Sequence, residues 1–174
     1  MPADLDLSDV EVSASGEYNQ KQLRRAVHRS TKIIGNVVDT YRQYTPCKLG
    51  IVFAVDIEHA KALTAEFVAK GVACELITAE HSEEERRIIL RRYRNRETLV
   101  LVNVDLFGEG FDLPAIEVVM FARPTASYAL YAQQFGRGLR LMIDKAFIAM
   151  WESYTAEQRK AIIRQSGKPV AHIH

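Results

Sequence analysis

Short apolar runs that alternate with helical patterns restrict the possible folds of this chain more than any other feature. The runs span residues 49–55, 72–78, 98–104 and 116–122, and each has the length of a strand. Helical repeats of apolar residues lie between the first three runs. Strands that are apolar on both faces are typical of parallel sheets covered by helices, with right-handed crossovers. The sequence therefore predicts a three-layer α/β fold with a mainly parallel sheet.

Capping residues and helix breakers predict where the helices begin and end. Three residue pairs carry the capping-box pattern: Asn19 with Gln22, Ser82 with Glu85, and Thr155 with Gln158. One helix should end at Pro46, and another should close at Gly71. These signals divide the chain into an N-terminal lead-in and helical arm, residues 1–45, and a main domain, residues 46–174. Residues 170–174 resemble a strand cut short, so we expect the chain to end inside a larger protein.

Composition fits one globular domain and excludes several classes of protein. The 174 residues are 48% hydrophobic, which is enough for a sizeable core. Lys and Arg total 23 against 22 Asp and Glu, so a nucleic-acid partner would need a local basic patch. No apolar run is long enough to span a bilayer, and the N-terminus lacks a signal-peptide pattern. We therefore expect a soluble, cytoplasmic protein that has no membrane partner.

The two cysteines and five histidines show no metal-binding pattern. Cys47 and Cys74 are isolated and too few for a zinc site or a disulfide framework, so we interpret both as small core residues in a reducing compartment. The histidines do not have the spacing of metal ligands. The sequence therefore predicts no metal site in this chain.

Two motifs after the third apolar run combine glycine, acidic residues and arginine. Gly-Glu-Gly-Phe-Asp-Leu-Pro occupies residues 108–114, where glycine would let backbone amides approach a phosphate or sugar. Gln-Gln-Phe-Gly-Arg-Gly-Leu-Arg occupies residues 133–140. If this segment is helical, Arg137 and Arg140 lie on one face and both can reach one polyphosphate. Because ligands gather at the carboxyl ends of parallel strands, we expect the first motif on the functional edge of the sheet.

The order of these motifs resembles motifs V and VI of superfamily-2 helicases. The apolar run 98–104, the 108–114 motif, Phe-Ala-Arg-Pro-Thr-Ala-Ser at 121–127 and the 133–140 motif follow one another as in RadD-type and type III restriction-like motors. The resemblance is good over residues 46–140. It implies the C-terminal lobe of an ATP-dependent helicase or translocase that acts on nucleic acid, with DNA favoured over RNA and both left open. The implied fold is RecA-like, of the P-loop NTPase type.

The resemblance implies a catalytic role for two arginines. Arg137 would be the arginine finger on the γ-phosphate of ATP, and Arg140 would be its companion on the phosphates. The chain contains neither the Gly-x-x-x-x-Gly-Lys-Ser/Thr loop nor an Asp-Glu metal motif. ATP and Mg²⁺ would therefore be held mainly by a missing N-terminal lobe of the same parent protein.

Further motif residues are implied to bind ATP. They are Gly108, Glu109, Gly110, Asp112, Gln133 and Gly136. By resemblance, Asp112 would accept a hydrogen bond from the ribose, while Glu109 and Gln133 would contribute to contacts between the two lobes. Many relatives have a threonine where this chain has Val104, which argues against a phosphate contact from that position.

A basic helix after Ser82 suggests where nucleic acid binds. The candidate residues are Arg86, Arg87, Arg91 and Arg92. This density of arginine suits a surface that follows a phosphate backbone, and relatives have an arginine like Arg86 near the nucleic-acid strand. The alternative is that the glutamates at 83–85 pair with these arginines and complement the helix dipole. The sequence leaves both interpretations open.

Three other functions compete with a helicase lobe. The first is a duplex translocase that never separates strands, and the second is a non-catalytic nucleic-acid or protein-binding module with a degenerate RecA-like fold. Two intact arginines, Arg137 and Arg140, argue against degeneracy. A mononucleotide-binding Rossmann domain is the third alternative, but residues 55–58 after the first apolar run contain no glycine-rich turn.

We expect the isolated chain to hydrolyse no ATP, because the groups that hold magnesium and the β-phosphate are missing. Phosphate release, measured with and without single-stranded DNA against a protein-free blank, tests this expectation. Turnover clearly above the blank that survives further purification would contradict the half-site interpretation.

Overall fold

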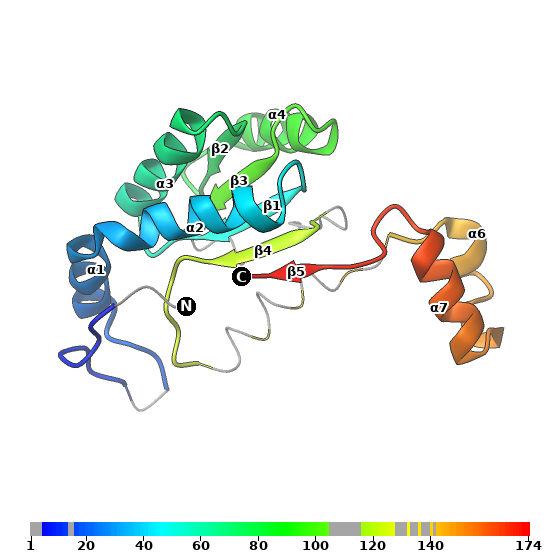
Figure 1. The fold of residues 1–174 in the computed structure, drawn as a ribbon, viewed down its shortest axis with the longest axis horizontal. Coiled ribbons are helices and arrows are strands. Elements are labelled where there is room, and N and C mark those ends of the chain that lie inside the picture. The colour runs from blue at the N-terminus through cyan, green and yellow to red at the C-terminus, as the bar shows by residue number, and fades with distance from the viewer. Residues whose placement is uncertain are drawn as a thin grey trace.

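The computed structural model describes residues 5–13, 16–104, 116–127, 132, 136, 140 and 142–174. In this part of the chain the strands form a five-stranded sheet in the order β2-β3-β1-β4-β5 (Figure 1). The strands are β1 (Gly50–Phe53), β2 (Cys74–Ile77), β3 (Val100–Asn103), β4 (Val118–Phe121) and β5 (His172–Ile173). Each pairs with its neighbours in parallel, which confirms the predicted α/β class with a parallel sheet.

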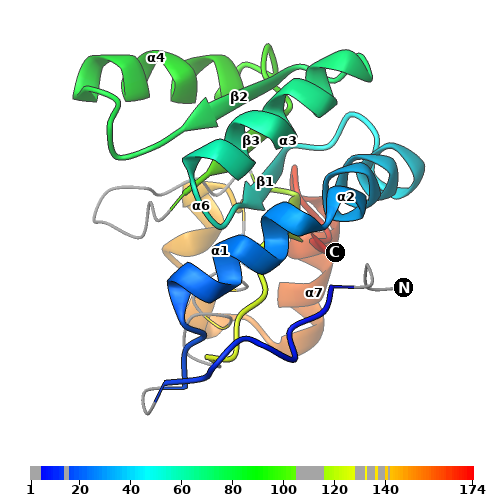
Figure 2. The ribbon, with the colours of Figure 1, turned by 90° about the vertical axis from the view of Figure 1, so that its left-hand side faces the viewer.

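Helices cover both faces of the sheet, as Figures 1 and 2 show. On one face lie α1 (Gln20–Arg29), α2 (Thr31–Tyr44) and α3 (Ile57–Ala69). On the other face lies α4 (Glu83–Arg94). The helical arm expected from the sequence therefore packs on the sheet and shares its core.

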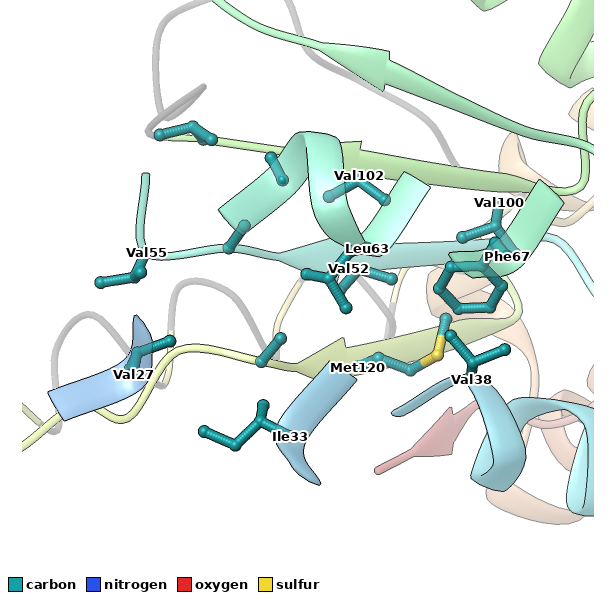
Figure 3. Close-up of a cluster of buried hydrophobic side chains, with 14 of the residues drawn as sticks. Val27, Ile33, Val38, Val52, Val55, Leu63, Phe67, Val100, Val102 and Met120 are labelled. Carbon is teal, nitrogen blue, oxygen red and sulfur yellow. The ribbon is translucent and has the colours of Figure 1, made fainter. Parts of the chain in front are cut away.

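The central strands send alternate side chains to two cores. Val52 of β1 and Val102 of β3 pack in the larger core with Phe67 of α3 (Figure 3). Ile51 of β1 points to the opposite face, where it packs in the cluster that contains Tyr93 of α4. Because both faces are covered, every residue of β1 and β3 is buried. This explains why the runs 49–55 and 98–104 are apolar without alternation.

The predicted capping boxes of α4 and α7 (Ala156–Gln165) are confirmed. Ser82 Oγ accepts from the backbone N–H of Glu85, whose carboxylate accepts in turn from the backbone N–H of Ser82. Thr155 and Gln158 make the same reciprocal pair. Each box satisfies two of the backbone N–H groups that a helix start leaves without partners.

The capping box predicted for α1 is wrong in one half. Asn19 Oδ1 does accept from the N–H groups of Lys21 and Gln22. Gln22 Oε1, however, accepts from the N–H of Glu11 at 2.8 Å, and the Asn19 N–H donates to Glu11 O. The lead-in segment passes beside the start of α1 and offers partners that a local sequence pattern does not contain.

The interpretation of both cysteines as core residues is wrong for Cys47. Cys74 is buried in β2, but Cys47 is exposed. Cys47 lies in the turn that joins α2 to β1, with a φ of 63°. This left-handed backbone conformation is uncommon for a residue other than glycine, and it belongs to the sharp turn that directs the chain into the sheet.

A buried glutamate joins three segments at the amino ends of the strands. Glu117, just before β4, is 5% exposed. Its carboxylate accepts from the Leu49 N–H at 2.8 Å, from Lys48 Nζ at 3.2 Å and from Arg96 Nη2 at 2.8 Å. Burial alone would raise the pKa of Glu117, but these hydrogen bonds outweigh it and lower the pKa below its ordinary value. The carboxylate thus holds the starts of β1 and β4 together.

A small helical unit precedes β5. It contains α6 (Lys145–Ile148), the 3₁₀ helix η1 (Trp151–Ser153) and α7, and it lies beyond the amino end of β5 (Figure 1). Arg159 holds the unit together, because its Nε donates to Trp151 O at 2.9 Å and its guanidinium lies 5.6 Å from the Trp151 ring centroid. The predicted strand near the C-terminus is confirmed as β5, which pairs with β4.

Glu117→Gln is expected to lower the free energy of unfolding by about 1–3 kcal/mol at neutral pH, since it removes the negative charge from three charge-assisted or buried hydrogen bonds. The pKa of Glu117 is lower in the folded state, so its stabilising contribution is complete at neutral pH and is lost as the pH falls through that pKa. Urea denaturation across this pH range measures the difference.

Glu97→Gln is the matched control, because Glu97 is exposed and accepts only from Asn95 Nδ2 among the hydrogen bonds seen for its side chain in the described structure. It should change the free energy of unfolding little. Equal effects of the two substitutions at neutral pH would contradict the role assigned to Glu117.

Candidate functional site

Polar side chains with unsatisfied atoms gather next to the carboxyl ends of the strands. The atoms that are buried and lack a hydrogen-bond partner in the described structure include His59 Nε2, Arg86 Nε, Asn103 Oδ1 and Glu17 Oε2. Each belongs to a different strand end: His59 follows β1, Arg86 follows β2, Asn103 ends β3, and Glu17 contacts Thr125 after β4. Most buried polar groups are hydrogen-bonded, so a set of exceptions at one edge marks a candidate binding site.

The carboxyl end of β1 carries a histidine and aspartate cluster. Asp56 caps α3 by accepting from the His59 N–H at 2.8 Å, and its carboxylate also lies 2.9 Å from His28 Nε2 and 3.9 Å from Arg24 Nε. Burial opposes the ionised form of Asp56, but its hydrogen bonds with His59 and His28 lower its pKa overall. The cluster fixes the start of α3 at this edge.

His59 is neutral at physiological pH. It is 3% exposed, and burial lowers its pKa to about 4. Its Nδ1 accepts from the Val55 N–H at 3.4 Å. The proton of the neutral ring therefore lies on Nε2, so the unpartnered atom is a hydrogen-bond donor.

Asn103 supplies an acceptor at the end of β3. Its Nδ2 donates to Val52 O at 3.0 Å, which fixes the amide across two strands and leaves Oδ1 without a partner in the described residues. Val104 follows directly and is buried. Sequence reasoning missed both Asn103 and His59. The available signals were a polar residue closing an apolar run, and a histidine three residues after the helix-capping Asp56.

The four arginines predicted to bind nucleic acid do not form one surface. Arg86 is half-buried, with its Nε beneath the surface. Arg87 and Arg91 are exposed, and Arg87 pairs with Glu84 at 2.8 Å. Arg92 bonds through two nitrogens to the carboxylate of Glu75 on β2. The helical period of 3.6 residues explains this divergence, since neighbouring positions differ by about 100° around the axis.

The pairing alternative for α4 holds in part. Glu84 pairs with Arg87, as expected for that alternative. Glu85 instead completes the capping box, and Arg92 finds its partner on a neighbouring strand. Burial opposes ionisation of Glu75, but hydrogen bonds from Arg92 and Thr98 lower its pKa overall. The Arg92 side chain is thus bound to Glu75 within the domain. Arg86 instead lies near the start of α4, at the edge with the unsatisfied atoms.

The segment that leads into motif VI is held by the N-terminal lead-in and the first residue of α1. Arg123 Nη2 donates to Gln20 Oε1 at 3.0 Å, and Arg123 is buried. Thr125 Oγ1 lies 3.5 Å from Glu17 Oε1 and accepts from the Ser127 N–H at 3.2 Å. The Arg-Pro-Thr segment after β4 is therefore fixed by contacts with residues more than a hundred positions earlier.

Most motif residues predicted from the sequence lie outside the described residues. These are Gly108, Glu109, Gly110, Asp112, Gln133 and Arg137, and the helix expected after Ser127 is described only at residues 132 and 136. Gly136 is described: it is helical and half-buried, and open space lies where a Cβ would stand. Arg140 is exposed. The structure therefore tests neither the catalytic nor the ATP-binding assignments.

The described residues contain no group of three or more His, Cys, Asp or Glu side chains arranged to hold a metal ion. Nor does the described part of the chain contain a helix that is long and apolar enough to cross a membrane.

Comparison with known proteins gives consistent matches. Residues 19–142 match the helicase conserved C-terminal domain family. The chain is 35% identical over 144 residues to IRC3 of Saccharomyces cerevisiae, whose name assigns it to the ATP-dependent helicases; the match covers 80% of this chain and 20% of IRC3. It is 31% identical over 144 residues to the 51.5 kDa protein of a Lactococcus phage, covering 83% of this chain and 31% of that protein.

Solved structures agree on the fold. The C-terminal domain of the DEAD-box protein Dbp5 superimposes with a TM-score of 0.58 at 17% identity, over 83% of this chain and 69% of that domain. This likeness confirms the predicted three-layer, RecA-like fold. The chain spans only 20% and 31% of the two sequence relatives, so each of those proteins contains much more than this unit.

Proposed function

The chain belongs to the helicase conserved C-terminal domain family, and from that premise we propose that it is the C-terminal motor lobe of an ATP-dependent helicase or translocase. Its partner is an N-terminal RecA-like lobe of the same parent protein, and its nucleic acid is DNA. The proposal rests on the family match, on the RecA-like fold and on the unsatisfied polar edge of the sheet.

The buried polar atoms without partners at the carboxyl edge of the sheet are the observation that supports nucleic-acid binding. Arg86 Nε and His59 Nε2 are donors suited to phosphate oxygens, whereas Asn103 Oδ1 and Glu17 Oε2 are acceptors suited to sugar hydroxyls or base amino groups. A mixed set of donors and acceptors fits a nucleotide chain better than it fits an inorganic anion. Because these groups are already buried and fixed by the fold, a ligand that pairs with them adds hydrogen bonds without ordering new side chains.

ATP is proposed to lie between this lobe and the N-terminal lobe, which provides the Mg²⁺ ligands. Bound there, ATP supplies the phosphoryl transfer whose energy opens and closes the two lobes. Arg137 and Arg140 would bring positive charge to the phosphates, and Gly108, Glu109, Gly110, Asp112, Gln133 and Gly136 would line the nucleotide. Exposure of Arg140 supports contact with a second lobe. The cytoplasmic location stays a prediction.

Arg137→Lys in the two-lobe parent protein is expected to lower kcat for ATP about a hundred-fold or more, with little change in ATP affinity. Lysine keeps the charge but loses the planar fork that matches phosphoryl oxygens. Steady-state ATPase assays with single-stranded DNA measure both quantities. Arg164→Lys, an exposed arginine on α7, is the matched control and should leave kcat near the wild-type value. Wild-type turnover by Arg137→Lys would remove Arg137 from the finger role.

Arg86→Ala is expected to weaken binding of a single-stranded oligonucleotide and to reduce the slope of log affinity against log salt by about one. Fluorescence anisotropy over a salt series gives the slope, and DNA and RNA of equal length distinguish the two substrates. DNA should bind more tightly. Because Arg86 is half-buried, the melting midpoint of the variant is measured alongside.

Arg87→Ala is the neighbouring control, since Arg87 faces solvent and pairs with Glu84. It should leave the salt slope unchanged. If instead Arg87→Ala flattened the slope and Arg86→Ala did not, nucleic acid would contact the outer face of α4 and not the edge of the sheet.

A further inference from the structure

A lysine from the C-terminal helical unit binds the end of motif VI. Lys168 Nζ donates a hydrogen bond to the backbone carbonyl of Arg140 at 2.7 Å. The two residues are 28 positions apart, and Lys168 lies between α7 and β5. An ammonium that donates to a carbonyl makes one of the stronger hydrogen bonds in proteins, because the donor is charged.

Lys168 is buried, which is unusual for lysine. It is 4% exposed, and burial lowers its pKa to about 8, although the carboxylate of Glu117 acts in the opposite direction. Burying an ammonium is unfavourable unless it is well hydrogen-bonded. The Arg140 carbonyl is a partner of this kind, so the contact is a fixed part of the structure and not a chance approach of a surface side chain.

The turn around Lys168 is itself anchored. Ser166 ends α7 by donating from Oγ to Ile163 O at 2.7 Å, and it accepts from the Lys168 N–H at 3.3 Å. Gly167 packs beside Met142, whose Cε would lie 3.8 Å from a Cβ at position 167. A second contact thus joins the turn to the residues that follow Arg140.

The strand after this turn fixes its position on the sheet. The His172 N–H donates to Glu117 O at 2.8 Å, and β5 pairs in parallel with β4. Lys168 therefore lies four residues before His172, which is bound to the residue that precedes β4. The other end of β4 leads to the Arg-Pro-Thr segment. Described contacts consequently hold both flanks of motif VI: Arg123 and Thr125 upstream, and Arg140 downstream.

We propose that Lys168 is a positioning residue for the motif VI arginine Arg140, through which the helical unit of α6 and α7 sets the reach of that arginine toward ATP. This inference rests on the proposed function of Arg140. Lys168 lies beyond residues 19–142, the part that matches the helicase family, so the anchor belongs to the C-terminal extension of this chain. In this proposal the C-terminal extension contributes to ATP turnover by positioning Arg140.

Lys168→Met in the two-lobe parent protein tests the proposal, because methionine has a similar length and is apolar but cannot donate. We expect kcat for ATP to fall about ten-fold while KM for ATP changes less than about two-fold, as for a displaced transition-state group. Lys160→Met, on the exposed side of α7, is the matched control and should leave both constants unchanged. Thermal melting of each variant reports folding.

A double-mutant cycle with Arg140→Ala separates positioning from general support. If Lys168 acts through the Arg140 side chain, Lys168→Met should have little further effect on kcat once that side chain is absent. Additive effects on kcat would overturn the inference, as would wild-type kcat in Lys168→Met. Should Lys168→Met not fold, Lys168→Gln, which keeps an N–H donor group on a shorter side chain, enters the cycle with the same expected non-additivity.

The same assays distinguish failure of this inference from failure of the proposed function. If Arg137→Lys and Arg140→Ala both turn over ATP at the wild-type rate, the role of motif VI is wrong whatever Lys168 does. If they are slow and Lys168→Met is not, only the positioning role is wrong.

Discussion

The parallel hydrogen bonding of the sheet is the constraint on which the rest of the structure depends. β1 pairs in parallel with both β3 and β4, and β2 and β5 continue the same direction outward. All strands therefore end at one edge. A connection between parallel strands must return along a face of the sheet from the end of one strand to the start of the next. For this reason α3 and α4, which follow β1 and β2, each begin at that edge. His59, Arg86 and Asn103 are brought to the same edge by this geometry although they are far apart in sequence.

The two edges of the sheet differ in the hydrogen bonding of their buried polar groups. At the amino ends, Glu117 is satisfied by three donors, and the Tyr41 hydroxyl donates to Lys48 O at 2.6 Å. At the carboxyl ends, Asn103 and Arg86 keep buried atoms without partners in the described structure. Unpaired buried groups lower stability. The amino edge thus holds a buried carboxylate whose partners are all within the fold, whereas the carboxyl edge combines satisfied contacts such as the Asp56 cluster with buried atoms that keep no partner in the described structure.

The C-terminal unit shows how segments far apart in the sequence meet. β5 adds to the sheet beside β4, and the turn before it carries Lys168 to the Arg140 carbonyl. The start of α1 supports the other flank, where Gln20 accepts a hydrogen bond from Arg123. Motif VI is recognisable from its own residues, but these two supports are not, since neither lysine nor glutamine at those positions carries a local pattern.

The sequence by itself determined the strands, most helix boundaries and the family. Runs such as 98–104 are apolar because both faces are covered, and the capping box of Ser82 and Glu85 needs only neighbours within one helical turn. Only the tertiary structure decided which arginine of α4 is occupied by Glu75, that Gln22 binds Glu11, and that Cys47 is exposed. Local patterns report interactions within a few residues, whereas these outcomes depend on which segments the parallel sheet places side by side.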